Sequence, residues 1–172
     1  LWDAREPDQR ALGPGPQVAE LRRLLQGTPG EVFWAGGDIE PWFWAGRPAF
    51  ASLLQKGPAL FSRPLALEWK SRVDALLAAG LLRPADLRGW DRDAHQPEDV
   101  VLSAGAVTAF CGDARRPAAI VTPGDQRAAA PEGYPARLWT SPAPSGRLTL
   151  VDGRFRWRVD TAFTVILCRP PA

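Results

Sequence analysis

The sequence predicts a single α/β domain, layered around a mixed and mostly parallel sheet that ends in an antiparallel hairpin. Short apolar runs bounded by glycine or proline alternate with segments of helical periodicity along much of the chain. Two runs of alternating polarity then flank the turn Asp152-Gly153, and a continuous apolar run follows them. With 172 residues, 45% of them hydrophobic and 23% charged, the chain has the size and balance of one globular domain.

The first elements predicted are a lead-in, a helix and a strand. Residues 1–16 are polar and rich in proline and glycine, which predicts a linker, so the domain itself is expected over 17–172. Apolar residues recur at helical spacing over 16–26, which predicts a short helix. Residues 31–35 form a compact apolar run typical of a strand. Gly36-Gly37 lets the chain turn at the carboxyl end of that strand, where open α/β sheets usually bind ligands.

The next segments predict a second short strand and a long helix. Residues 38–46 allow no assignment beyond one helical turn, and 60–61 are apolar and bracketed by turn residues, which predicts a strand. The hydroxyl of Ser62 can cap a helix, and Pro64 suits its first turn. An apolar stripe then continues to just before Gly80. Its members are Leu65, Trp69, Val73, Leu76 and Leu77.

A second helix is predicted to lead into a buried strand. After a polar connection over 83–96, residues 97–110 begin with proline and two acidic residues and continue with apolar residues along one side, which predicts a helix. Residues 118–122 are short and apolar, as buried strands are. A helix followed directly by such a strand is typical of parallel α/β layers.

The last third of the chain predicts the antiparallel part of the sheet. Residues 137–140 form a weak strand, and 141–146 contain turn residues that predict a connection. Residues 147–151 and 154–159 alternate apolar with polar residues, which predicts a hairpin. Residues 162–168 are apolar throughout, so this last strand is expected inside the sheet and not at its edge.

The charged residues and the metal-ligating residues exclude two classes of function. Nineteen of the 21 basic residues are arginine, and they are scattered among acidic residues and not concentrated, which argues against nucleic-acid binding. One histidine and two cysteines cannot complete a four-ligand zinc site, so we expect no metal and no cofactor. Cys111 and Cys168 both lie in apolar runs, which favours buried free thiols. The alternative is a disulfide, which needs an oxidising compartment.

Few residues suggest catalysis. His95 lies in a polar segment and no GxSxG turn exists to present a serine, so a loop histidine is the better interpretation. Gly36-Gly37-Asp38 lacks the spacing of a nucleotide-binding fingerprint, which favours a tight turn. Asp38 and Glu40 could act in acid–base chemistry or hold a divalent cation, or they could simply face water.

Two groups of residues are candidates for binding. The densest aromatic group consists of Trp34, Trp42, Phe43, Trp44 and Phe50. These rings could fill the core, contact a membrane-embedded partner through Trp42 and Trp44, or stack on sugars.

The second binding candidate is the pair Ser62 and Arg63 at the predicted helix start. Backbone N–H groups at a helix N-terminus favour an anion, so this pair could receive a phosphate. A simple cap with an arginine in solvent is the competing interpretation.

A block from Glu31 to Trp69 resembles the soluble tail of multispanning bacterial membrane proteins of the glycosyltransferase type that use polyprenyl-phosphate sugars. The residues that match its pattern are Val32 to Gly36, Pro41 to Phe43, Gly46-Arg47-Pro48, Phe50, Gln55, Gly57, Leu60 to Arg63, Ala66 and Arg72. Residues 165–169 form a weaker match to the last strand of such tails.

The resemblance implies an extracytoplasmic C-terminal domain on the periplasmic face of the inner membrane. Such a domain would be non-catalytic alone, and it would cap the active-site cavity or help recognise a lipid-linked sugar or a glycan acceptor. Its partner would be the transmembrane part of its own parent chain, whose anchor is expected before Leu1, since no apolar run here approaches the length of a membrane span. The oxidising compartment that the resemblance implies would permit the Cys111–Cys168 disulfide.

Two other functions remain open on the sequence alone. The first is a small free-standing α/β enzyme that acts on a sugar or a nucleotide through Asp38 and Glu40. The second is a secreted interaction module with no small-molecule site.

Overall fold

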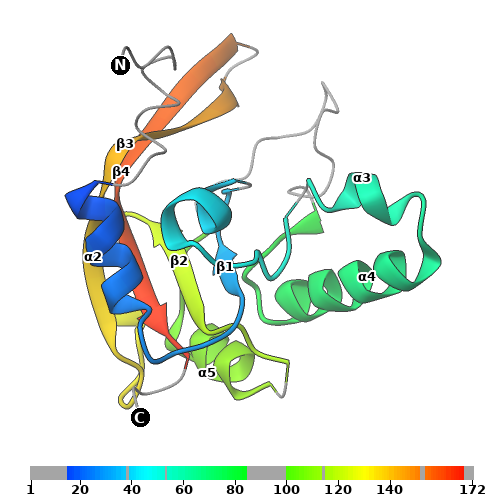
Figure 1. The fold of residues 1–172 in the computed structure, drawn as a ribbon, viewed down its shortest axis with the longest axis horizontal. Coiled ribbons are helices and arrows are strands. Elements are labelled where there is room, and N and C mark those ends of the chain that lie inside the picture. The colour runs from blue at the N-terminus through cyan, green and yellow to red at the C-terminus, as the bar shows by residue number, and fades with distance from the viewer. Residues whose placement is uncertain are drawn as a thin grey trace, which may run out of the picture.

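The computed structural model describes residues 15–37, 39–52, 54–84, 100–113, 115–151 and 154–168, and for 143–151 and 154–159 it describes the backbone alone. Asp38, His95 and the turn Asp152-Gly153 lie outside the described residues, as do residues 1–14 of the expected lead-in. In chain order the elements are α2 (Pro16–Leu24), β1 (Val32–Trp34), the π-helical turn η1 (Pro41–Ala45), α3 (Lys56–Ala59), α4 (Arg63–Ala78), α5 (Ala104–Gly112), β2 (Ala119–Pro123), the 3-10 turn η3 (Arg127–Ala129), β3 (Ala136–Val151) and β4 (Arg154–Leu167), as Figure 1 shows.

The described strands form one four-stranded mixed sheet in the order β1-β2-β4-β3. β1 runs parallel to β2, with Phe33 opposite Ile120, and the other two pairs are antiparallel. The predicted α/β class with a mixed sheet and a closing hairpin is therefore confirmed. The expectation that the sheet is mostly parallel is wrong for the described strands, because β1–β2 is the one parallel pair and β4 runs antiparallel to β2 and to β3. The last strand lies between β2 and β3, inside the sheet as its continuous apolar sequence predicts.

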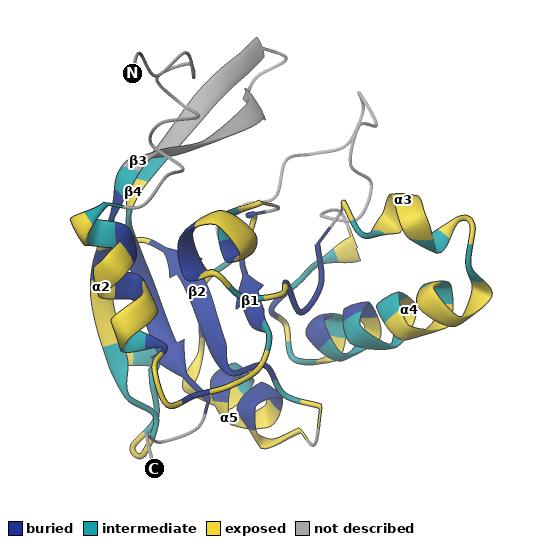
Figure 2. Cartoon of the chain, in the orientation of Figure 1, coloured by how far each residue is buried: buried dark blue, intermediate teal, exposed yellow. Residues whose placement is uncertain are grey.

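Alternation along the strands builds a core on each face of the sheet. Val32 and Trp34 of β1 contribute to the core beneath α2 and η1, whereas Phe33 contributes to the core beneath α4 and α5. β2 repeats the pattern with Val121 on the first side and Ile120 on the second. The described part of the chain thus has three layers, helix, sheet and helix, and Figure 2 shows its buried residues gathered along the strands and the helix faces toward them.

Several predicted elements are confirmed. α2 occupies most of 16–26, and it buries Val18 and Leu21 of its apolar stripe. β1 and β2 lie within one residue of the predicted strands, and β3 and β4 pair as the predicted hairpin. The long helix α4 begins directly after Ser62 and ends before Gly80. Each of these segments has a periodic apolar face, which the sheet or a neighbouring helix covers.

Residues 60–61 do not form the predicted strand. They follow α3 in a hydrogen-bonded turn, in which the N–H of Phe61 donates to Pro58 O over 3.1 Å. Leu60 and Phe61 are 78% and 91% exposed, and neither pairs with a strand among the described residues. The predicted cap is also wrong in detail, because Ser62 takes the N-cap position of α4 but its hydroxyl makes no capping hydrogen bond.

α5 begins seven residues later than the 97–110 prediction. Ser103 is its N-cap, and the Ser103 hydroxyl accepts a hydrogen bond from the N–H of Ala106 over 3.1 Å. The preceding residues are held by Gln126, whose amide accepts from the Leu102 N–H over 2.7 Å and donates to Val100 O over 2.9 Å. Because these bonds satisfy the backbone in an extended form, Val100 stays outside the helix.

The predicted connection over 141–146 is wrong, because β3 continues through it as one strand with a register shift between Thr140 and Ser145. Pro142 and Pro144 lie within this irregularity and have no N–H to donate. β3 is an edge strand of the sheet, and an edge tolerates proline because one side of the strand needs no ladder hydrogen bond.

Candidate functional site

The candidate site is built on the turn that follows β1. The N–H of Ala35 still pairs with Val121 O of the neighbouring strand over 2.8 Å, and the chain then turns at Gly36, whose φ is +71°. Gly37 lies against Trp34 and Glu40. A Cβ atom on Gly37 would lie 2.8 Å from Glu40 Oε2 and even closer to the buried Trp34 ring, so only glycine fits there.

The turn continues into η1, one turn of π-helix. Glu40 is its half-buried N-cap residue, and Glu40 Oε2 accepts a hydrogen bond from the Ile39 N–H over 3.1 Å. Pro41 opens the turn, and Gly46 closes it in the left-handed region at φ +62°. Turns of this kind are rare and occur often at functional sites, because they change which side chains a helical segment presents.

Arg22 of α2 and Arg47 fix η1 against the helix layer. Arg22 Nε donates to Trp44 O over 3.2 Å, and its Nη2 donates to Phe43 O over 3.0 Å. Arg47 Nη2 donates in return to Leu25 O, just after α2, over 3.2 Å. These bonds join carbonyl groups at the ends of η1 and α2 to side chains of the other segment, so η1 is held at several points.

The aromatic residues of this region divide into core and surface. Trp44 is 2% exposed and packs with Trp34, Trp139 and Phe163, whose ring centroids lie 5.6–6.4 Å from its own. Trp34 and Phe50 are likewise buried. For these three residues the structure bears out the core interpretation, and it places the Trp44 ring away from any binding surface.

Trp42 and Phe43 lie on the outside of the same turn. Their exposed fractions are 39% and 49%, and that of the neighbouring Ile39 is 37%. We call Ile39, Glu40, Trp42 and Phe43 the π-turn surface. It combines flat apolar rings with one carboxylate, on a backbone that the hydrogen bonds of Arg22 fix in place. Such a surface can bind an amphipathic ligand, because the rings can pack on its apolar face while the carboxylate accepts hydrogen bonds from its polar groups.

The other predicted site residues lie elsewhere. Ser62 and Arg63 begin α4, Ser62 half-buried and Arg63 exposed, and they belong to a different element from Glu40. Asp38, the expected partner of Glu40, lies outside the described residues, so the structure does not test the carboxylate pair.

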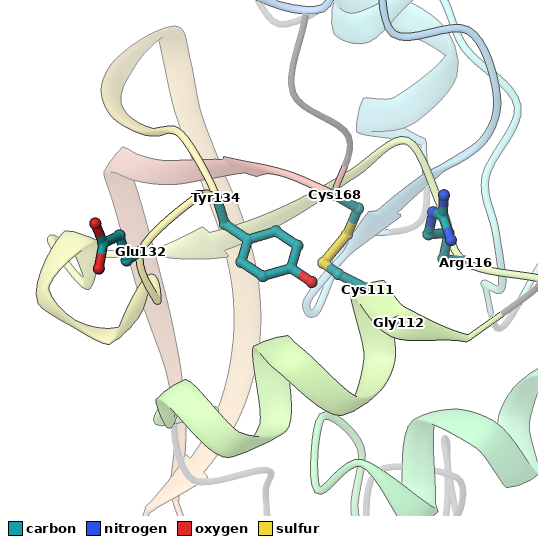
Figure 3. Close-up of a pocket in the computed structure, with 7 residues that line it drawn as sticks. Cys111, Gly112, Arg116, Glu132, Tyr134 and Cys168 are labelled. Carbon is teal, nitrogen blue, oxygen red and sulfur yellow. A yellow bond between two sulfur atoms is a disulfide. The ribbon is translucent and has the colours of Figure 1, made fainter.

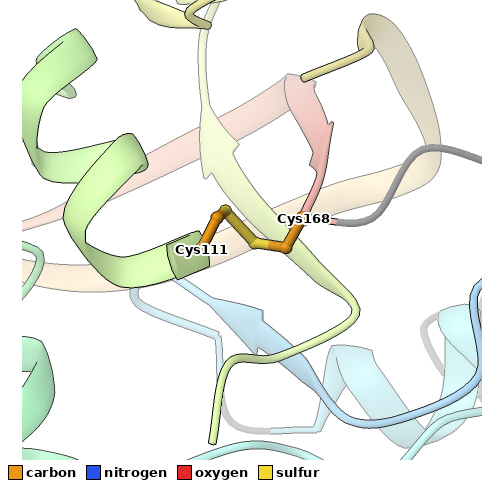
Figure 4. The surroundings of a disulfide bond; sticks show 2 residues. All are labelled: Cys111 and Cys168. Carbon is orange, nitrogen blue, oxygen red and sulfur yellow. A yellow bond between two sulfur atoms is a disulfide. The ribbon is translucent and has the colours of Figure 1, made fainter. Parts of the chain in front are cut away.

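Cys111 and Cys168 form a disulfide, so the free-thiol interpretation is wrong. The S–S distance is 2.05 Å and the two Cα atoms are 4.8 Å apart. Figure 4 shows the bond joining the end of α5 to the end of β4. The disulfide brings together residues 57 positions apart, because α5 and β4 end close to each other at the same end of the strands.

An open depression of about 380 Å³ lies beside the disulfide. Figure 3 shows the Tyr134 hydroxyl directed toward the sulfur atoms and the Glu132 carboxylate directed away from them. Its lining consists of Cys111, Gly112, Arg116, Glu132, Gly133, Tyr134 and Cys168. Sequence reasoning missed this depression because its walls come from three separate segments and carry no common motif.

Within the described residues no group of three or more His, Cys, Asp or Glu side chains is placed to hold a metal ion. The described helices include none with the length and apolar character needed to cross a bilayer. Comparisons with protein-family models, with curated proteins and with solved structures find no match to this chain.

Proposed function

We propose that this chain is the extracytoplasmic domain of a glycosyltransferase-like membrane protein, and that it recognises a glycan acceptor or a lipid-linked sugar without carrying out the chemistry. The observation that carries the proposal is the π-turn surface, which places Trp42, Phe43 and Glu40 together at the carboxyl end of β1. In open α/β sheets, ligands usually bind beside the carboxyl ends of the strands.

The π-turn surface suits a sugar for chemical reasons. The exposed Trp42 ring offers a flat apolar face on which the C–H groups of a pyranose can pack. The Glu40 carboxylate, on the same turn, can accept hydrogen bonds from ring hydroxyls. Because hydrogen bonds from Arg22 already fix the conformation of the turn, little conformational entropy is lost when a ligand binds.

The disulfide supports the extracytoplasmic part of the proposal. Disulfides such as Cys111–Cys168 persist in oxidising compartments, including the bacterial periplasm, and are rare in the cytosol. The resemblance of 31–69 to the tails of polytopic glycosyltransferases supports the same location, and it makes the parent's own transmembrane part the expected partner.

The proposal is tested by titrating the domain with soluble mannose, glucose and N-acetylglucosamine oligosaccharides, and with a polyprenyl-phosphate hexose in detergent micelles, while following tryptophan side-chain resonances. We expect one of these probes to shift the Trp42 signal. Trp42→Ala should weaken its binding by about tenfold, the value of one aromatic contact. Glu40→Gln should weaken it as well, since the charged acceptor is lost.

Phe61→Ala is the matched control, because Phe61 is exposed but lies on a different surface. Its binding should equal that of the unchanged protein. Absence of binding by every probe, or equal binding by Trp42→Ala, would contradict the proposal. Detected turnover of a sugar or nucleotide that Glu40→Gln abolishes would favour the free-standing enzyme instead. A signal peptide with no membrane spans upstream of Leu1 would favour the secreted interaction module.

A further inference from the structure

The segment 54–67, formed by α3 and the first turns of α4, extends from the side of the layered core, and we call it the arm. α4 has 16 residues and is therefore about 24 Å long, but its buried residues, Val73 and Leu76, lie in its second half. Figure 1 shows α3 and the start of α4 at the far side of the molecule from α2, and Figure 2 shows them mainly in the colour of exposed residues.

The arm exposes large apolar side chains. Phe61 is 91% exposed and Leu60 is 78% exposed. Leu54, Leu65 and Leu67 are between 51% and 58% exposed. Single exposed apolar residues are ordinary, but five within 14 residues on one projecting element mark a contact surface.

The arm is anchored, so its exposure does not come from a loose end. The indole N–H of Trp69 donates to Ser52 O over 2.9 Å, which joins α4 to the chain before α3. Arg72 Nη1 bonds Glu31 Oε1 over 2.6 Å and Phe50 O over 2.8 Å. Burial alone would lower the pKa of Arg72, but hydrogen bonds to Glu31 and Glu68 raise it, so the anchor stays charged.

The charge of the arm indicates what covers it. Residues 41–67 contain three cations, Arg47, Lys56 and Arg63, and not one Asp or Glu, although the whole chain has 19 acidic residues. Lys56 and Arg63 lie within the arm, beside its apolar residues, and both are exposed. Glu68 follows the arm directly, but its carboxylate is paired with Arg72 over 2.8 Å. An apolar tip that carries two exposed cations and no acid of its own complements a lipid bilayer whose headgroups are anionic, because the apolar residues enter the acyl boundary while the cations meet the phosphates.

We propose that the arm inserts into the surface of an anionic lipid bilayer and orients the domain on it. The inference concerns a surface separate from the π turn, and it holds or fails without the glycan-binding proposal.

The test is co-sedimentation of the whole chain with vesicles of phosphatidylcholine alone and with vesicles that contain about 25% phosphatidylglycerol. We expect stronger binding to the anionic vesicles, and weaker binding when NaCl rises from about 0.05 to about 0.5 M. The double variant L60S/F61S should lower the partition coefficient by about tenfold or more, because it removes two large apolar side chains from the contact. K56E/R63E should reduce the preference for the anionic vesicles.

V101S is the matched control, since Val101 is also 80% exposed but lies outside the arm, and it should bind as the unchanged protein does. Circular dichroism shows whether each variant is folded, as expected for changes at exposed positions. Binding that L60S/F61S leaves unchanged would overturn the proposal. So would failure to bind either vesicle. Self-association of the chain that L60S/F61S abolishes, without vesicle binding, would also overturn it and would assign the arm to a second copy of the chain.

Discussion

At the scale of single residues, neighbouring tryptophans have opposite roles. Trp42 is 39% exposed, whereas Trp44 is 2% exposed and touches three other aromatic rings. Residues two apart in a helical turn point to roughly opposite sides, so η1 directs one ring to solvent and the other into the core. Composition alone could not distinguish these two residues.

We therefore expect opposite effects of two alanine substitutions. Trp44→Ala should lower the free energy of unfolding by about 3–5 kcal/mol, because it leaves a cavity among packed rings. Trp42→Ala should change it by less than about 0.5 kcal/mol. Urea denaturation followed by circular dichroism measures both. Similar losses in the two variants would show that the assignment of core and surface is wrong.

Asp125 and Arg127 make a prediction about pH. Arg127 Nη2 and Nε donate to the two oxygens of Asp125 over 2.7 and 2.9 Å. The side-chain hydrogen bonds of Arg127, followed by its backbone N–H, lower the pKa of Asp125 from 3.8 to about 2. Because the folded-state pKa is depressed, the pair favours folding above pH 3.8, and the contribution is lost as the pH falls toward 2. Both groups are exposed, so the effect on stability is small.

NMR titration of the Asp125 carboxyl carbon checks this prediction. Its midpoint should lie near 2 in the unchanged protein and should rise toward 3.8 in Arg127→Ala. High salt should also raise the midpoint, because it screens an exposed pair. A midpoint that Arg127→Ala leaves in place would contradict the assignment.

At the scale of elements, the disulfide joins a helix and a strand that lie far apart in the chain. α5 buries Val107, Phe110 and Cys111 against the sheet, and the bond attaches its last turn to the end of β4. The cysteines are 57 positions apart, so the bond removes a large part of the freedom of the unfolded chain.

Loss of this bond should lower the free energy of unfolding by about 2–4 kcal/mol, as expected for a closed loop of this length. Denaturation of the C111S/C168S variant, and of the unchanged protein with and without a reductant, measures the loss. The reductant should have no effect on the variant, which serves as the control. Equal stability of all samples would show that the bond contributes nothing to folding.

Other elements show how tertiary contacts change local preferences. Residues 97–103 have a helical pattern, but Gln126 binds Val100 and Leu102 in extended form, and the helix begins after Ser103. Residues 141–146 contain turn residues, but the edge position of β3 lets them continue as an irregular strand. In the first case a partner distant in sequence supplies the hydrogen bonds, and in the second the position of the strand in the sheet removes the need for some of them, and no local pattern reveals either.

At the scale of the whole molecule, the described residues place their two surfaces on different elements. The π-turn surface follows β1 at the edge of the sheet, and the arm extends where α4 runs past the core. The sheet gives both a common support, because β1 contributes alternate residues to the two hydrophobic cores. A domain with this arrangement can lie on a bilayer through the arm and bind a glycan through the π turn, as the two proposals require.

The amino-acid sequence was enough to predict the α/β class, the short helix α2, the long helix α4, and the hairpin with its buried last strand, because these depend on apolar periodicity and turn residues that act locally. The sequence also made Glu40 a candidate as one of a pair of carboxylates, and Trp42 a candidate as a member of the densest aromatic group. The folded structure was needed to show that Trp44 lies in the core, that the two cysteines are bonded, and that residues 60–61 are exposed and not paired. Those outcomes depend on tertiary contacts, and contacts between residues far apart in the chain leave no periodic pattern in the sequence.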